Sequence, residues 1–350
     1  MRYRKWLFFI LIVECICLSG CANGTERFVS EEALLMYKES GRAGETSSEG
    51  QSASSTLGGE NLSAQSGQDD SSQLQMDPNG EFALTVTSYQ IESELRLQTE
   101  TEDFPYAYIV YPEFELTKEA QVAYPQLANR LQADNDDIKE EAVEELANAT
   151  SLAIDGAGNW LATSNQRTAS TEVFRADDKM FGYRIIYDGY YNGAHPDMWF
   201  VSVAYDTQSG ERLPLADVIN DVEQMKKLPQ IILENLVSAA QEEYQFTAEE
   251  NAQMLPKIEE MVADNALVWT LDETGFHVYF DAYDLQFYAF GPIFCDLTLE
   301  EYPDLIVEKY RPEPVKEALV DRITYKNADT KVYTISDLEP YKEYFSEDGL

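Results

Sequence analysis

The residues best suited to chemistry lie together in one short stretch, residues 187–197. His195, one of only two histidines in the chain, stands two residues before Asp197. A histidine beside a carboxylate could act as a general base or bind a metal. A structural turn explains the same residues, since Gly193 gives backbone freedom and Pro196 fixes φ. Both interpretations stay open. Without a second histidine nearby, zinc is poorly supported, and we expect neither a metal nor a cofactor.

The same stretch is rich in aromatic residues. Tyr190 and Tyr191 lie in its Gly/Asn-rich part, where we expect them to be exposed. Tyr and Trp dominate binding hot spots. Tyr190, Tyr191, His195 and Asp197 are therefore our candidates for ligand binding. For the aromatic residues on the flanking strands, core packing is the alternative to stacking on a sugar or anchoring a protein; these are Tyr187, Trp199 and Phe200.

A second chemical feature lies near the N-terminus. Leu18-Ser19-Gly20-Cys21 follows a basic start and an apolar run. A small pair before a cysteine is typical of a bacterial lipoprotein cleavage site, at which the Cys21 thiol is acylated. The run is too short for a transmembrane helix of about 20 residues, and a plain secretory signal usually ends in Ala-x-Ala. We predict a signal peptide over 1–20 and a diacylglyceryl-Cys21 that anchors the chain on the extracytoplasmic face of the cell membrane.

The charge of the chain is strongly acidic. It has 64 Asp and Glu against 25 Lys and Arg, a net charge of −39, and loss of residues 1–20 removes three basic and one acidic residue. This argues against nucleic acid, whose binding depends on Lys and Arg that neutralise phosphates. It favours a cationic partner, since complementary fields speed association. Solubility alone is the alternative explanation.

The composition divides the chain into five segments. After the signal peptide, residues 21–80 are a Ser/Gly/Gln/Glu-rich linker that cannot bury enough surface to offset its ordering entropy, so we expect disorder. An N-terminal domain over 81–170, a C-terminal domain over 171–310 and a tail over 311–350 follow. Cys295 alone remains after Cys21, in an apolar context typical of a small buried residue.

The grouping of elements predicts an α+β fold with antiparallel sheets packed with helices in two adjoining subdomains. A helix over 118–147 has an acidic side that is solvated by default; its members are Asp134, Asp136, Asp137, Glu140, Glu141, Glu144 and Glu145. The other expected helices cover 225–244 and a segment that begins at Thr247. The expected strands cover 82–87, 91–97, 106–114, 170–175, 180–188, 198–206, 267–271, 275–281, 285–290 and 331–335.

Three motifs resemble the C-terminal domain of the RsiV/PdaC-type family. They are Gly193-Ala194-His195, the segment 203–217 with Asp206-Thr207 and Leu215-Ala216-Asp217, and Tyr288-Ala289-Phe290-Gly291. Glu211 replaces the usual Lys of the family, and Asn192 stands where a second Gly is common. The N-terminal half, with Tyr111-Pro112, resembles the domain that usually precedes it.

The resemblance implies an extracytoplasmic module. Relatives occur in lipoproteins, in an anti-sigma factor that recognises lysozyme, and in peptidoglycan deacetylases whose catalytic domain is separate. We therefore expect a non-catalytic binding module at the cell envelope, with a cationic, lysozyme-like protein or a cell-wall glycan as its ligand. The alternative is an enzyme that modifies cell-wall polymer through His195 and Asp197.

Overall fold

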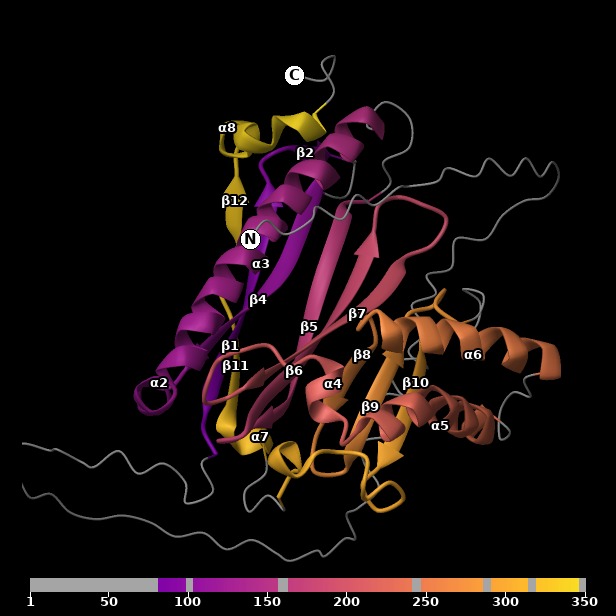
Figure 1. The fold of residues 1–350 in the computed structure, drawn as a ribbon. Helices are drawn as coiled ribbons and strands as arrows, with labels where there is room; N and C mark the ends of the chain where they lie inside the picture. Colours follow the sequence, from indigo (N-terminus) through magenta and orange to yellow (C-terminus); the bar gives the residue numbers. More distant parts are fainter. Residues whose placement is uncertain are drawn as a thin grey trace, which may run out of the picture. The chain divides into compact units, whose positions relative to one another are not determined.

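The computed structural model describes residues 81–98, 103–156, 163–240, 247–285, 291–313 and 319–345. Cys21, the predicted signal peptide and the predicted linker lie outside the described residues. The chain divides into two compact units, and the second, Ser71–Leu350, holds every described residue. That unit has the predicted α+β fold, in which mixed and antiparallel sheets pack with helices (Figure 1).

The larger sheet has the strand order β11-β1-β4-β5-β6-β7, and β12 also pairs with β1. The β1/β4, β5/β6 and β6/β7 pairs are antiparallel, whereas β4/β5, β1/β11 and β1/β12 are parallel. Its strands are β1 Leu84–Ser93, β4 Ala107–Leu116, β5 Asn165–Ala176, β6 Met180–Tyr190, β7 Asp197–Asp206, β11 Ile323–Asn327 and β12 Lys331–Tyr333.

Strand β1 is a single strand, although two strands separated by residues 88–90 were expected. Ser88, Tyr89 and Gln90 pair with β4 in the same register as their neighbours. None of the three is a residue that favours a turn through positive or fixed φ, as Gly, Asn or Pro does. The predicted separation into two strands was therefore wrong.

The predicted long helix is two helices, α2 Lys118–Ala123 and α3 Pro125–Gly156. Thr117 caps α2, and its side chain accepts a hydrogen bond from the Ala120 N–H. The break falls at Tyr124, whose φ of −126° and ψ of 63° are not helical. A residue before proline is disfavoured in the helical region, and proline is well accommodated at a first helical position. Helix α3 then runs over β4 and β1 (Figure 1).

A three-stranded antiparallel sheet, β10-β9-β8, packs with helices α5 and α6 around a separate apolar cluster. Cys295 lies in that cluster and is 3% exposed, so the prediction of a buried residue is confirmed. Strand β10 was not predicted; the expected strand at 285–290 falls mostly outside the described residues. The bounds are α5 Val222–Ala240, α6 Ala248–Ala263, β8 Val268–Leu271, β9 Gly275–Phe280 and β10 Ile293–Thr298.

Short elements complete the described part of the chain. The predicted helix that begins at Thr247 is α6, and Thr247 and Glu250 form a capping box at its start. Thr298 and Glu301 have the spacing of such a box and are hydrogen-bonded to each other, but a turn follows them rather than a helix. The short elements are β2 Arg96–Gln98, β3 Asp103–Pro105, α4 Leu215–Val218, η2 Glu308–Tyr310, α7 Leu319–Arg322, α8 Ile335–Leu338 and η3 Glu339–Tyr344.

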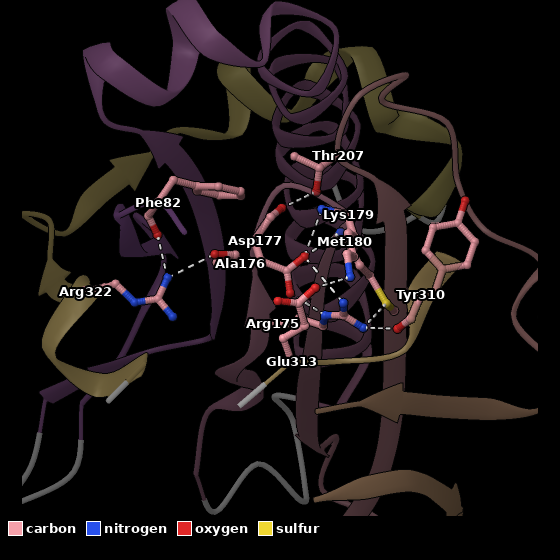
Figure 2. Close-up of polar contacts among 10 residues, drawn as sticks. All are labelled: Phe82, Arg175, Ala176, Asp177, Lys179, Met180, Thr207, Tyr310, Glu313 and Arg322. Atoms are coloured by element: carbon pink, nitrogen blue, oxygen red, sulfur yellow. Dashed lines mark hydrogen bonds and ion pairs between the residues drawn. The ribbon is translucent and has the colours of Figure 1, made fainter. Parts of the chain in front are cut away.

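Two arginines, the buried Arg175 and the half-buried Arg322, tie the later part of the chain to the larger sheet (Figure 2). The Arg175 guanidinium is 4% exposed, and it pairs with Asp177 at 2.6 Å while donating to the Tyr310 carbonyl. Arg322 of α7 donates to the Ala176 carbonyl at 2.9 Å and to the Phe82 carbonyl at 3.2 Å. The larger sheet therefore draws strands from both sides of position 170 and from the segment after 311; the predicted domain boundaries stay a prediction.

Candidate functional site

The connection between β6 and β7 carries the residues that the sequence singled out. Gly189 and Asp197 are the last pair of this hairpin. Asn192 has a φ of +54°, a conformation that asparagine tolerates better than most non-glycine residues. Its side-chain amide donates to Asn165 Oδ1 at 2.8 Å. This hydrogen bond joins the β6–β7 connection to the first residue of β5.

Tyr190 and Tyr191 are half-buried rather than exposed. The Tyr191 hydroxyl donates to Glu145 Oε1 of α3 at 2.6 Å. Burial, and then the charge and hydrogen bond of Glu145, raise the pKa of Tyr191. Burial also raises the pKa of Glu145, which the hydrogen bond from Tyr191 partly offsets. Tyr191 therefore joins the β6–β7 connection to α3, a role that leaves its hydroxyl engaged.

The structure brings His195 and Asp197 together at the tip of the hairpin. His195 Nδ1 lies 3.6 Å from Asp197 Oδ1 and 3.0 Å from the Pro196 carbonyl oxygen. The Tyr283 hydroxyl lies 3.4 Å from His195 Nε2. A distance of 3.6 Å is longer than a hydrogen bond, and both candidate side chains are exposed. This geometry is that of a surface turn whose imidazole lies against the adjacent backbone.

A buried arginine lies beneath the connection. The Arg167 side chain is 4% exposed, and its Nη1 pairs with Glu141 Oε1 at 2.8 Å. Its guanidinium lies over the Tyr187 ring at 4.8 Å from the centroid. Among the described residues, Nε and Nη2 have no hydrogen-bond partner. Sequence reasoning missed Arg167, because no motif distinguishes it from other arginines; only the fold places it under the candidate residues.

The aromatic rings form a layer against the hairpin backbone. Tyr187 and Trp199 are cross-strand partners whose rings stack at 5.3 Å between centroids. Gly189 makes room for this layer, since a Cβ there would lie 3.1 Å from the Trp199 ring and 3.2 Å from the Tyr191 ring. Burial raises the pKa of Tyr187 to about 12, with Arg167 opposing. Trp199 is half-buried and Val201, on the same side of β7, is 38% exposed.

The neighbouring part of α3 presents exposed carboxylates. Asp136, Asp137, Glu140 and Glu141, named here the acidic row, are all exposed. Glu141 reaches Arg167, so the acidic row borders the aromatic layer of the hairpin.

Asp134 does not belong to this solvated side, and its predicted exposure was wrong. It is 2% exposed and pairs with Arg130 at 2.7 Å and with Arg212 at 3.1 Å. It also accepts a hydrogen bond from the Tyr205 hydroxyl. The charge run in the sequence gives no sign of this, because Arg212 and Tyr205 come from the distant β7 region.

In the part of the chain that the structure describes, no group of three or more His, Cys, Asp or Glu is arranged to hold a metal ion. None of the helices in the described ranges is long and apolar enough to cross a membrane.

The comparisons with known proteins give structural likenesses alone. No protein-family model and no curated protein matches the chain. A DUF3298-family protein from Bacteroides fragilis is similar with 16% identity and a TM-score of 0.44 over 66% of this chain and 96% of that one. A DUF3298-family protein from Pseudomonas aeruginosa PAO1 has 14% identity and a TM-score of 0.41 over 67% and 99%. Both TM-scores lie below 0.5, and neither likeness assigns a family, an activity or a partner to this chain.

Proposed function

We propose that this chain is a lipid-anchored, extracytoplasmic binding module that holds a cationic, lysozyme-like protein without catalysing a reaction. The observation that supports it best is the acidic row beside the aromatic layer of the β6–β7 hairpin. Exposed carboxylates attract and orient a basic partner. The half-buried Trp199 and the exposed Val201 supply apolar contact area next to them.

The charge balance around this surface favours a basic ligand. Within the acidic row, Glu141 pairs with Arg167, and Asp136 has a neutral partner in the Gln132 amide at 3.1 Å. Asp197 adds a carboxylate that is 64% exposed at the tip of the hairpin. The whole chain carries −39, so long-range attraction acts in the same direction as the local charges.

The test separates the acidic row from the total charge. In a triple variant, Asp136→Asn, Asp137→Asn and Glu140→Gln neutralise three carboxylates on α3. A matched control neutralises three exposed carboxylates at the end of α6, through Glu259→Gln, Glu260→Gln and Asp264→Asn. We expect the α3 variant to bind lysozyme about tenfold more weakly at low salt and the α6 control to bind nearly as well as the unmodified protein. Equal losses of affinity in the two variants would mean that net charge, and not the acidic row, determines lysozyme binding.

The location is part of the proposal and has its own test. We propose acylation at Cys21, with Cys21→Ala as the variant. The unmodified chain should partition with membranes after expression in a lipoprotein-processing bacterium, and the variant should not. A variant that stays in the membrane fraction would contradict the anchor, whatever it binds.

A cell-wall glycan is the second candidate ligand, and the half-buried Trp199 favours it, because aromatic faces bind the apolar faces of sugars. Trp199→Ala should then abolish binding to insoluble cell wall while the α3 triple variant retains it. The catalytic alternative, modification of cell-wall polymer through His195 and Asp197, would require turnover that is lost in His195→Ala.

A further inference from the structure

The larger sheet opens between β4 and β5. These strands pair only where Ala107–Ile109 meets Asn165–Arg167. Further along β4, a side chain of α3 replaces β5 as the hydrogen-bond partner. Asn135 accepts from the Phe114 N–H and donates to the Phe114 carbonyl, both at 2.9 Å. Pro112, between these points, has no N–H to offer a neighbouring strand. At Phe114, strand β4 therefore bonds to α3 instead of β5.

The opening is closed again at its other end. The Phe82 N–H donates to the Ala176 carbonyl at 3.2 Å, and Arg322 reaches the carbonyls of both residues (Figure 2). Tyr325 of β11 also lines this groove, opposite the β5 residues 169–171. The result is a short groove with two closed ends, rather than a channel through which a long chain could run.

This groove has a volume of about 310 Å³, near the lower limit for small-molecule sites. Residues of four strands line it: β1, β4, β5 and β11. The lining includes Ser88, Ala169, Ser170, Thr171, Tyr325 and Asn327.

The chemistry of the lining differs from that of the rest of the protein. It contains no carboxylate, although the chain carries −39. Its polar side chains carry four hydroxyls, on two Ser, one Thr and Tyr325, with the Asn327 amide and one lysine. Each of these hydroxyls both donates and accepts, as the hydroxyls of a sugar do. Tyr325 is 52% exposed and offers an aromatic face at the rim.

The edge of β5 adds backbone groups to the groove. Ala169 and Thr171 lie beyond the last β4 pair, on the stretch of β5 that faces the groove. A strand edge presents amide N–H and carbonyl groups at fixed spacing. A ligand that itself carries an amide complements such an edge, because it can donate and accept there at once.

We propose that this groove is a binding site for one N-acetylated sugar ring, with the acetamido group against the β5 edge and the apolar ring face on Tyr325. The lining holds no pair of carboxyl groups of the kind that glycoside hydrolysis uses, so the site binds without cleaving. It lies apart from the acidic row and does not rest on the cationic partner proposed above.

The experiment is a titration of the isotopically labelled protein with N-acetylglucosamine and, separately, with glucose, followed by amide chemical shifts. We expect saturable shifts at Thr171 and Asn327 with N-acetylglucosamine, and binding about tenfold weaker with glucose, which lacks the amide. Tyr325→Ala should weaken binding by about tenfold, and Tyr325→Phe, which keeps the ring, by less. Val332→Ala, an exposed position on neighbouring β12, is the control and should bind normally.

The proposal would be overturned by the absence of saturable shifts around the groove, by equal binding of glucose, or by unchanged binding in a folded Tyr325→Ala protein. Shifts confined to Trp199 and the β6–β7 hairpin would place sugar binding at the other site and would also overturn it. None of these results bears on lysozyme binding, which is measured with the α3 variant.

Discussion

The Tyr191 hydroxyl donates to Glu145 Oε1 at 2.6 Å, and this bond joins the β6–β7 connection to α3. It fixes the aromatic layer next to the acidic row, which is the relationship on which the proposed binding surface depends. A turn that carries ligand-binding residues gains precision when it is fastened to a rigid element in this way.

Tyr191→Phe removes this bond and keeps the ring. We expect a loss of about 1–2 kcal/mol in the free energy of unfolding, because the half-buried Glu145 carboxylate loses its donor. Urea denaturation measures it. Tyr283→Phe is the control, because that side chain is 58% exposed and its variant should stay within about 0.5 kcal/mol of the unmodified protein. Similar losses of unfolding free energy in both variants would mean that the Tyr191–Glu145 hydrogen bond adds no stability of its own.

Arg167 offers a test of a buried cation that is only partly satisfied. Arg167→Met keeps most of the volume beneath the hairpin, and we expect it to be near neutral or to cost under about 1 kcal/mol, because Nε and Nη2 have no partner to lose. Arg167→Ala should cost about 2–4 kcal/mol through the space left under Tyr187. Thermal unfolding of both variants distinguishes packing from charge. A Met variant as unstable as the Ala variant would show that the ion pair with Glu141 is what matters.

Asp134 and Asp136 are a matched pair two residues apart on α3. Asp134→Ala should lower the free energy of unfolding by about 1–3 kcal/mol, since the buried Tyr205 hydroxyl loses its acceptor while Arg130 and Arg212 stay partly exposed. Asp136→Ala should change it by less than about 0.5 kcal/mol. Equal effects in chemical denaturation would contradict the buried position of Asp134.

We expect the free energy of unfolding to depend on pH through His277. Its Nε2 lies 3.1 Å from Asp272 and its Nδ1 2.7 Å from Asp296. Burial lowers the pKa of His277, but hydrogen bonds and charge from these two carboxylates outweigh it and raise the pKa from 6.5 to about 9. The folded state therefore binds the proton more tightly than the unfolded state. The stabilisation is complete below pH 6.5 and is lost as the pH rises through about 9.

The measurement for His277 is denaturation of the unmodified protein and of His277→Gln across that range. The difference in the free energy of unfolding should shrink as the pH rises from 6.5 to 9, by up to about 3 kcal/mol. A difference that is constant with pH would mean that His277 is neutral in the folded state.

The parts of the fold that local pattern decides were predictable from the sequence. Strands β5, β6 and β7 and the helices α5 and α6 follow their apolar periodicity, and Thr117 and Thr247 cap helices as their side chains allow. The break at Tyr124-Pro125 also has a local signal, because the residue before a proline is disfavoured in a helix. Local residues carry this information, because periodicity and capping act within one or two turns.

The parts that depend on distant partners could not be predicted. The parallel pairing of β11 with β1 joins residues about 240 apart, and no local pattern specifies it. Asp134 looks like its exposed acidic neighbours until Arg212 and Tyr205 meet it. Arg167 comes to lie under the hairpin only because β5 pairs with β6. The candidate residues at 190–197 were thus found together, whereas the side chains that support them were not.

Titration of the α3 triple variant with lysozyme at low and high salt is the sharpest test of whether a cationic protein binds at the acidic row. We expect the unmodified protein to bind at low salt and to bind more weakly as salt rises. We expect binding about tenfold weaker by the α3 triple variant and nearly unmodified binding by the α6 control. No binding by the unmodified protein at low salt, or an equal loss in both triple variants, would contradict it.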